Sequence, residues 1–210
     1  MPDSTAFRGP HGPLPALDPE RDRARLLALL VRRSLLFGSF RLSSGTTSEF
    51  YIDVRKTSLD PEGAEYLGRL VCAAYAEEVT SGEVTAVGGL TLGADPLVVA
   101  FAGEAFRRGV RLEAFLVRKA PKEHGAENRI EGNLTAGARA LILDDVCTSG
   151  ESTVLAVEAA RAAGATVTRT WCVVDRRAGG REALEARGVA LTACLEVETL
   201  LAAGRAAQGR

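Results

Sequence analysis

Residues 139–153 read Arg-Ala-Leu-Ile-Leu-Asp-Asp-Val-Cys-Thr-Ser-Gly-Glu-Ser-Thr and combine an apolar run with a loop of small residues. The run 140–143 is short and bounded, which is typical of a strand buried on both faces of a parallel sheet. Two acids, Asp144 and Asp145, follow it, and an alanine-rich helix is expected over about 152–163. The stretch therefore predicts the strand–loop–helix unit of an α/β protein.

The loop after the two acids has the composition of a phosphate site. A helix N-terminus presents unpaired N–H groups and a partial positive charge, so small residues leading into it suit a phosphate monoester. The loop lacks the Gly-x-x-x-x-Gly-Lys spacing of a P-loop. Carboxylates would repel a phosphate beside them, so Asp144 and Asp145 are better placed to bind sugar hydroxyls or a hydrated Mg²⁺. The alternative is that these acids only end the strand and cap the turn.

This segment resembles the phosphoribosyl pyrophosphate (PRPP) motif of the type I phosphoribosyltransferases. The resemblance implies an α/β fold with a mostly parallel central sheet flanked by helices and a small N-terminal hood. It also implies Mg²⁺ as a cofactor, bound mainly through PRPP and not directly by protein ligands. The Glu151 side chain is expected to turn outward while its backbone N–H donates. The residues of this segment implied to bind PRPP are Asp144, Asp145, Val146, Cys147, Thr148, Ser149, Gly150, Glu151 and Ser152.

A hairpin is expected over residues 40–56, around a turn at Ser44 and Gly45. Its Phe-x-Leu-x-Ser-Gly pattern, followed by aromatic residues and an acid, resembles the hood of the orotate phosphoribosyltransferases. That resemblance implies that Tyr51 and Ile52 line the pocket of the pyrimidine ring. Many family members carry a lysine where this chain has Ser43. An ordinary hairpin with an aromatic core residue is the alternative.

A second ligand loop is expected at Gly88-Gly-Leu-Thr-Leu-Gly-Ala-Asp-Pro96, between a strand at 84–87 and a helix that ends near residue 107. The glycines let the backbone approach a ligand closely, and a proline is tolerated in a first helical turn. The segment resembles the loop whose backbone contacts pyrophosphate in this family. Some relatives have a lysine at the place of Gly93, so no side-chain contact is expected there. A tight turn without a ligand is the alternative.

A cationic loop follows the strand expected at 112–117. Three cations and a histidine lie within seven residues, around a proline and before a glycine, a composition that suits neither core nor helix. The pattern resembles the flexible catalytic loop of the same family, which implies a homodimer with active sites shared between subunits. A solvated charged surface is the alternative. The implied PRPP-binding residues are Arg118, Lys119, Lys122 and His124, and the implied catalytic residues are Lys119, Lys122, His124, Asp144 and Asp145.

A last motif, Asp175-Arg-Arg177, ends a strand expected over 166–174. In the family, an Asp-Arg pair here supplies an arginine to the carboxylate of orotate, which implies Arg176; Thr148 is implied at the orotate as well. A guanidinium binds a planar carboxylate in a fork, which lysine cannot imitate. An arginine on a solvated loop is the alternative.

The whole chain bounds these hypotheses. Its 210 residues are 46% hydrophobic and suit one domain, which is expected over 20–210 with a hood formed largely by 20–56. Residues 1–19 hold five of the eight prolines and are expected to be a disordered tail. Its 26 basic and 27 acidic residues nearly cancel, which disfavours nucleic acid or a membrane surface as partner. Four scattered cysteines and the lack of any bilayer-length apolar run predict a cytoplasmic protein.

Four motifs in the family's order, within about residues 35–200, imply the reaction of the orotate phosphoribosyltransferases: PRPP and orotate give orotidine 5′-monophosphate and pyrophosphate, in pyrimidine biosynthesis. Two alternatives remain open. A phosphoribosyltransferase for another base would keep the acid loop without needing Arg176 or Tyr51. A ligand-sensing regulator of the same fold would bind nucleic acid and should carry a basic face or an added DNA-binding domain.

Overall fold

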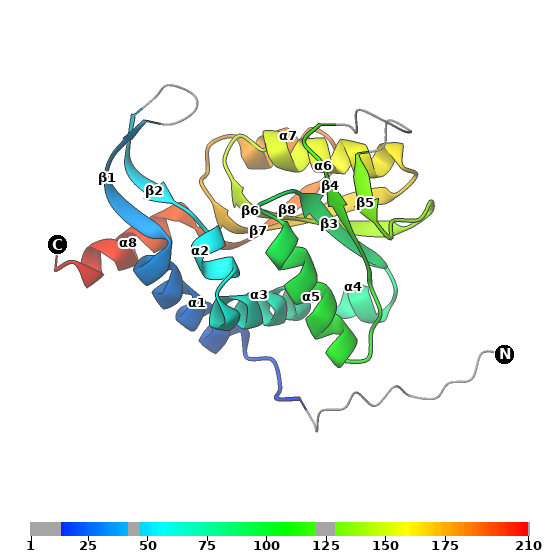
Figure 1. The fold of residues 1–210 in the computed structure, drawn as a ribbon, viewed down its shortest axis with the longest axis horizontal. Coiled ribbons are helices and arrows are strands. Elements are labelled where there is room, and N and C mark those ends of the chain that lie inside the picture. The colour runs from blue at the N-terminus through cyan, green and yellow to red at the C-terminus, as the bar shows by residue number, and fades with distance from the viewer. Residues whose placement is uncertain (1–13, 42–46, 121–128, 210) are drawn as a thin grey trace.

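The computed structural model describes residues 14–41, 47–120 and 129–209, and its centre is a six-stranded sheet (Figure 1). Neighbouring strands run parallel except for the first pair, β5 and β4, which is antiparallel. In the order in which they lie side by side, the strands are β5 (Ile130–Gly132), β4 (Glu113–Val117), β3 (Ala86–Leu90), β6 (Arg139–Cys147), β7 (Thr166–Asp175) and β8 (Ala190–Glu196). The predicted mostly parallel α/β sheet is confirmed.

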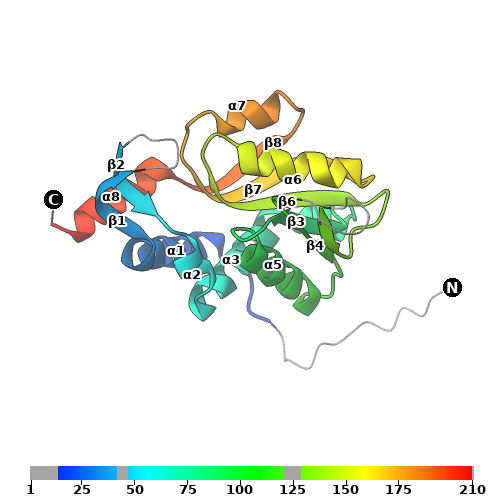
Figure 2. The ribbon, with the colours of Figure 1, turned by 45° about the horizontal axis from the view of Figure 1, so that its top comes forward.

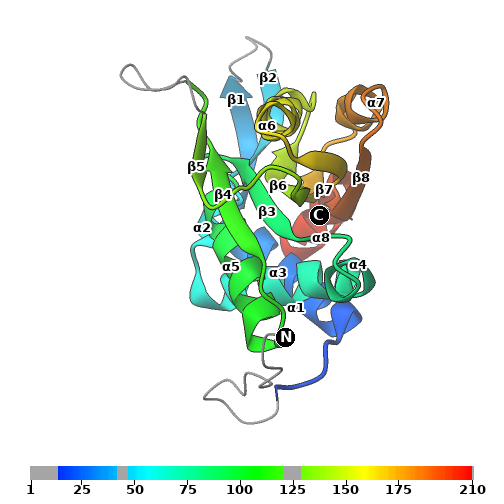
Figure 3. The same cartoon turned by 90° about the vertical axis from the view of Figure 1, so that its right-hand side faces the viewer.

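Helices cover both faces of this sheet, as Figure 3 shows with α6 and α7 on one side and α3 and α5 on the other. Two separate clusters of buried side chains fill the two interfaces. Along β6 the side chains alternate between them, because successive residues of a strand point to opposite faces. Leu141 and Leu143 join the cluster under α3 and α5, whereas Ala140 and Ile142 join the one under α6. The helices of these layers are α3 (Pro61–Ala74), α4 (Ala76–Thr80), α5 (Asp95–Arg107), α6 (Glu151–Ala162) and α7 (Gly180–Glu185).

The N-terminal hairpin forms a sheet of its own, beside the first and last helices (Figure 2). Its strands, β1 (Leu35–Arg41) and β2 (Thr47–Ile52), are antiparallel; the flanking helices are α1 (Pro19–Arg33), α2 (Arg55–Ser58) and α8 (Val197–Ala207). Gly204 of α8 lies so close to β1 that an added Cβ would meet the Phe37 ring at about 3.0 Å. The C-terminal helix therefore supports the hairpin, which the sequence did not predict.

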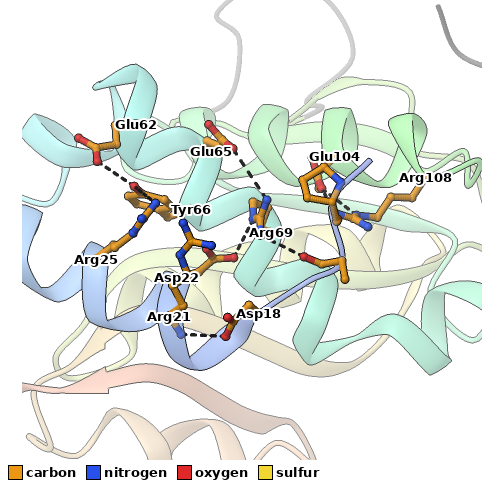
Figure 4. A network of polar contacts seen from close by, with 12 residues as sticks. Asp18, Arg21, Asp22, Arg25, Glu62, Glu65, Tyr66, Arg69, Glu104 and Arg108 are labelled. Carbon is orange, nitrogen blue, oxygen red and sulfur yellow. Dashed lines mark hydrogen bonds and ion pairs between the residues drawn. The ribbon is translucent and has the colours of Figure 1, made fainter. Parts of the chain in front are cut away.

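A network of ion pairs and hydrogen bonds ties the start of the described chain to α1, α3 and α5 (Figure 4). Arg69 of α3 bonds the buried Asp22 of α1 at 2.7 Å and the carbonyl oxygen of Ala16 at 3.3 Å. Burial opposes the charge of Glu104 on α5, but hydrogen bonds from Arg107 and Arg108 outweigh it and lower the pKa of its carboxyl. These contacts hold residues that the sequence places in a disordered tail.

The boundaries of several elements differ from the sequence-based prediction. The tail was expected to reach residue 19, but Asp18 caps α1 and Pro19 is its first residue. β6 extends four residues beyond Leu143, so both acids lie within the strand. α2, α4 and β5 were not predicted, because segments of three to five residues carry too little periodicity.

No helix in the described ranges is long and apolar enough to cross a membrane. All four cysteines are buried free thiols. Burial raises the pKa of the Cys72 thiol to about 12 and that of Cys147 to about 11. The prediction of reduced core cysteines is confirmed.

Candidate active site

The predicted ligand loops meet at one edge of the central sheet, because the carboxyl ends of parallel strands share an edge. From β3 the chain proceeds outward to β4, whereas from β6 it proceeds in the opposite direction to β7 and β8. The point between β3 and β6 is therefore where the strand order reverses, and open α/β sheets bind ligands in the crevice at such a point. The loop after β3 and the loop after β6 flank it.

Asp144 is a buried carboxylate with few donors. Its side chain accepts hydrogen bonds from the hydroxyl of Thr153 at 2.5 Å and from the N–H of Asp145 at 2.9 Å. Burial raises the pKa of Asp144 to about 7, and the hydrogen bond from Thr153 partly opposes that shift. Charge on Asp144 therefore costs stability, which is typical of a residue retained for its chemistry.

Asp145 is half-buried and lies over the loop that follows β3. A Cβ added at Gly93 would come within 2.6 Å of its carboxylate oxygen Oδ1. Nearby, hydrogen bonding to Asp53 raises the pKa of the Arg55 guanidinium, with smaller contributions from Tyr51 and Asp145. A cation that the sequence did not single out thus lies within electrostatic range of the site.

The loop between β6 and α6 has the geometry of an anion site. Gly150 caps the helix at a φ of 80°, a left-handed conformation that favours glycine. An added Cβ at Gly180 would lie 2.7 Å from the Thr148 carbonyl oxygen, so the start of α7 packs directly on this loop. Thr148, Ser149, Glu151 and Ser152 are exposed. Val146 is half-buried and Cys147 buried, so their side chains face the core.

The cationic loop is only partly described. Arg118 follows β4 directly, its N–H donates to the Arg129 carbonyl and its guanidinium lies 3.4 Å from Glu131. The Lys119 side chain is exposed, and its carbonyl oxygen accepts from Arg129 at 2.7 Å. Lys122 and His124 lie outside the described residues.

Arg176 at the end of β7 meets the hairpin, but through a residue that the sequence did not assign. Its guanidinium carbon lies 4.9 Å from the centroid of the Phe50 ring. Tyr51 is 38% exposed and points to the opposite face of β2, where its ring centroid lies 5.7 Å from that of Phe40. Ile52 packs against the core on the Phe50 face.

The carboxylates of the site fit a metal ion that binds together with the substrate. No group of three or more His, Cys, Asp or Glu able to hold a metal occurs in the part of the chain that the structure describes. Mg²⁺ typically binds through substrate phosphates and keeps several waters. Two carboxylates beside a phosphate loop suit such an ion without forming a protein cage.

Comparison with known proteins decides the family. The orotate phosphoribosyltransferase of Aquifex aeolicus is 40% identical over 183 residues, covering 86% of this chain and 98% of the relative. The chain belongs to the orotate phosphoribosyltransferase family. The Streptomyces avermitilis enzyme of that name is 42% identical over 164 residues, covering 78% of this chain and 88% of the relative. No protein-family model matches the sequence.

Solved structures of the orotate phosphoribosyltransferase family agree with the fold. The Mycobacterium tuberculosis enzyme in complex with PRPP superposes with a TM-score of 0.71 at 36% identity, covering 85% of this chain and 98% of that one. The predicted phosphoribosyltransferase fold is thereby confirmed. Within it, sequence reasoning missed Arg55, Phe50, Thr153 and Gly180. Of these four residues, only Thr153 had a signal in the sequence, because it ends the motif at 139–153 that also contains Asp144.

Proposed function

We propose that this protein transfers the phosphoribosyl group of PRPP to N1 of orotate, giving orotidine 5′-monophosphate and pyrophosphate in pyrimidine biosynthesis, with Mg²⁺. The observation that supports this proposal is that the acid pair and the small-residue loop lie at the point where the strand order reverses, with Arg176 bonded through its N–H to Cys147 beside them. Family membership supports the substrates. The buried free thiols support a cytoplasmic location.

Charge assigns the roles. As the bond to pyrophosphate breaks, negative charge gathers on the leaving group and the ribose becomes cation-like, so the site needs cations at one end and carboxylates at the other. We place Asp144 and Asp145 beneath the ribose and the 5′-phosphate on the loop from Thr148 to Ser152. Arg118 and Lys119, with Lys122 and His124, would bind the pyrophosphate. His124 is proposed to protonate it, since the unperturbed pKa of histidine lies near neutrality.

Mg²⁺ bound with PRPP would neutralise part of the diphosphate charge. The protein's own task is then to orient the sugar and to bind the departing group. Thr148 and Ser149 are exposed, and the first N–H groups of α6 have no acceptor within the helix, so both are suited to this contact. The Mg²⁺ requirement is testable by chelation with EDTA, which should abolish turnover, and by readdition of MgCl₂.

A direct assay tests the function. Orotate absorbance in the ultraviolet should fall when the purified chain receives PRPP and Mg²⁺, whereas uracil, adenine and hypoxanthine should stay unconverted. Conversion of another base in place of orotate would assign a different phosphoribosyltransferase. Turnover of none of them, with specific retention of DNA or RNA on a filter, would favour the regulator.

Replacement of Arg176 with alanine should raise the KM for orotate about tenfold to a hundredfold, because a fork of charge-assisted hydrogen bonds to the carboxylate is lost. The KM for PRPP should change much less. Arg177→Ala is the matched control: this neighbouring arginine pairs with Glu196 at 2.8 Å on the surface. A larger effect on PRPP than on orotate would mean that the base lies elsewhere.

We further propose a homodimer whose subunits share active sites. Three apolar side chains are exposed on or after neighbouring elements: Leu92 in the loop after β3 is 67% exposed, Val99 on α5 is 70% exposed and Leu59 after α2 is 72% exposed. Covering such side chains with a second copy would remove apolar surface from water next to the pyrophosphate end of the site. That placement would bring the partner's cationic loop within reach.

Val99→Glu should shift the protein from dimer to monomer in light scattering, because it places a charge in the proposed apolar interface. Ala202→Glu on the exposed side of α8 is the control and should leave the dimer intact. As a second measurement, mixing an inactive Lys119→Ala chain with an inactive Asp144→Asn chain should restore part of the activity. Dimers that survive Val99→Glu would place the interface elsewhere, and a mixture without activity would exclude shared sites.

A further inference from the structure

Three arginines follow or lie near the end of β7, and they differ in their partners. Arg177 pairs with Glu196 at 2.8 Å, and Arg181 pairs with the buried Asp175 at 3.1 Å. Among the residues described, Arg176 has no carboxylate partner and meets the face of the Phe50 ring instead. Of the three, Arg176 is therefore the one whose hydrogen-bond donors remain available to a ligand.

The backbone of Arg176 is held from both sides. Its N–H donates to the Cys147 carbonyl oxygen at 2.8 Å, which ties it to the start of the phosphate loop. The next N–H, of Arg177, donates to the Asp175 carboxylate at 2.8 Å, and Arg177 takes a left-handed φ of 50°. A long side chain on a fixed backbone still has rotamer freedom, so a further contact must select its direction.

Phe50 supplies that contact from a different part of the fold. It belongs to β2, in the two-stranded sheet, and is half-buried against the core, so its own ring is fixed by packing. A guanidinium that lies over an aromatic face is attracted by the ring and uses no hydrogen-bond acceptor there, so its N–H groups remain for a carboxylate bound as a fork. The contact with Phe50 thus orients Arg176 without consuming its donors.

We infer that Phe50 is a positioning residue that holds the Arg176 guanidinium for the substrate's carboxylate, so that the hairpin helps to set the preference for a carboxylated pyrimidine. This inference rests on the proposed function, because it takes Arg176 as the orotate contact. The preference follows from desolvation. A base without a carboxylate would leave the partly buried Arg176 cation unpaired, and the cost of this disfavours binding of that base. Phe50 itself need not touch the base.

The test is Phe50→Leu, which keeps apolar volume and removes the aromatic face. The KM for orotate should rise about fivefold, the size expected for a lost cation–π contact, with the KM for PRPP within twofold of wild type. Phe50→Tyr should restore the wild-type KM for orotate. Phe37→Leu is the matched control, since Phe37 is the cross-strand neighbour of Phe50 and packs on the same core, but is not the ring that Arg176 stacks on.

A double-mutant cycle separates positioning from packing, because two residues that act through one contact lose it only once. Adding Phe50→Leu to Arg176→Ala should therefore cause no further rise in the KM for orotate. Three results would overturn the inference: a rise of about fivefold in the KM for orotate when Phe50→Leu is added to Arg176→Ala, the same rise in Phe37→Leu, or an unchanged KM in Phe50→Leu. If the wild-type protein still turns over orotate, the proposed function is unaffected by these results. A wild-type protein that does not consume orotate would overturn the function itself.

Discussion

Lys119→Ala is expected to lower kcat about a hundredfold or more, because it removes a donor from the charge that develops on pyrophosphate. The lysine lies two residues beyond β4, and its carbonyl is held by Arg129 at 2.7 Å while its side chain is exposed. The backbone is thus anchored while the exposed side chain is available to contact a ligand. The measurement is steady-state turnover of orotate at saturating PRPP and Mg²⁺.

Two variants make this result interpretable. Lys119→Arg keeps the positive charge and should retain more activity than Lys119→Ala. Arg111→Ala removes a cation from the opposite end of the same strand region, where the side chain is 78% exposed and pairs with Glu113. It should leave kcat within twofold of wild type, since surface ion pairs contribute little. Unchanged turnover in Lys119→Ala would remove the lysine from the mechanism.

The local parts of the site were predictable from the sequence, because each depends on residues adjacent in the chain. An apolar run, two acids and a loop of small residues predicted β6 and the loop that follows it, and Pro96 indicated the first turn of α5. Gly150 takes the left-handed conformation that such a loop requires. Alternation along β2 also predicts that Phe50 and Tyr51 point to opposite faces.

The parts that depend on tertiary placement were not predictable. Period-2 alternation does not say which face of β2 meets the end of β7, so the Phe50–Arg176 contact had no sequence signal. Gly204 packs on β1 residues whose numbers differ from its own by about 170, so this contact is remote in the sequence. Nor does a strand pattern show that Asp144 is 6% exposed whereas Asp145, one residue further, is half-buried.

That difference in burial makes Asp144 the place where function opposes stability. A charged carboxylate in a buried site costs free energy, and the two donors, Thr153 and the N–H of Asp145, offset only part of that cost. Enzymes commonly retain such residues at their active sites despite the loss of stability. Neutralising Asp144 without changing its shape should therefore move activity and stability in opposite directions.

Asp144→Asn should lower kcat on the order of a hundredfold, through loss of the charge beneath the ribose, and raise the free energy of unfolding at pH 8 by about 2 kcal/mol. Burial raises the folded-state pKa of Asp144 to about 7 from its ordinary value of 3.8, so the wild-type fold holds a proton that the unfolded chain releases between these values. Wild-type stability from this group hence falls as pH rises from about 4 to about 7 and is level above that range.

The variant lacks this slope, so its advantage in urea unfolding should be largest at pH 8 and should nearly vanish at pH 4. Asp145→Asn removes the same charge from a half-buried position and separates the effect of burial from that of net charge. An advantage that is equal at both pH values would show that Asn packs better for reasons unrelated to ionisation. A variant less stable than wild type at pH 8 would mean that Thr153 and the N–H of Asp145 solvate the carboxylate fully, and that Asp144 carries no stability cost.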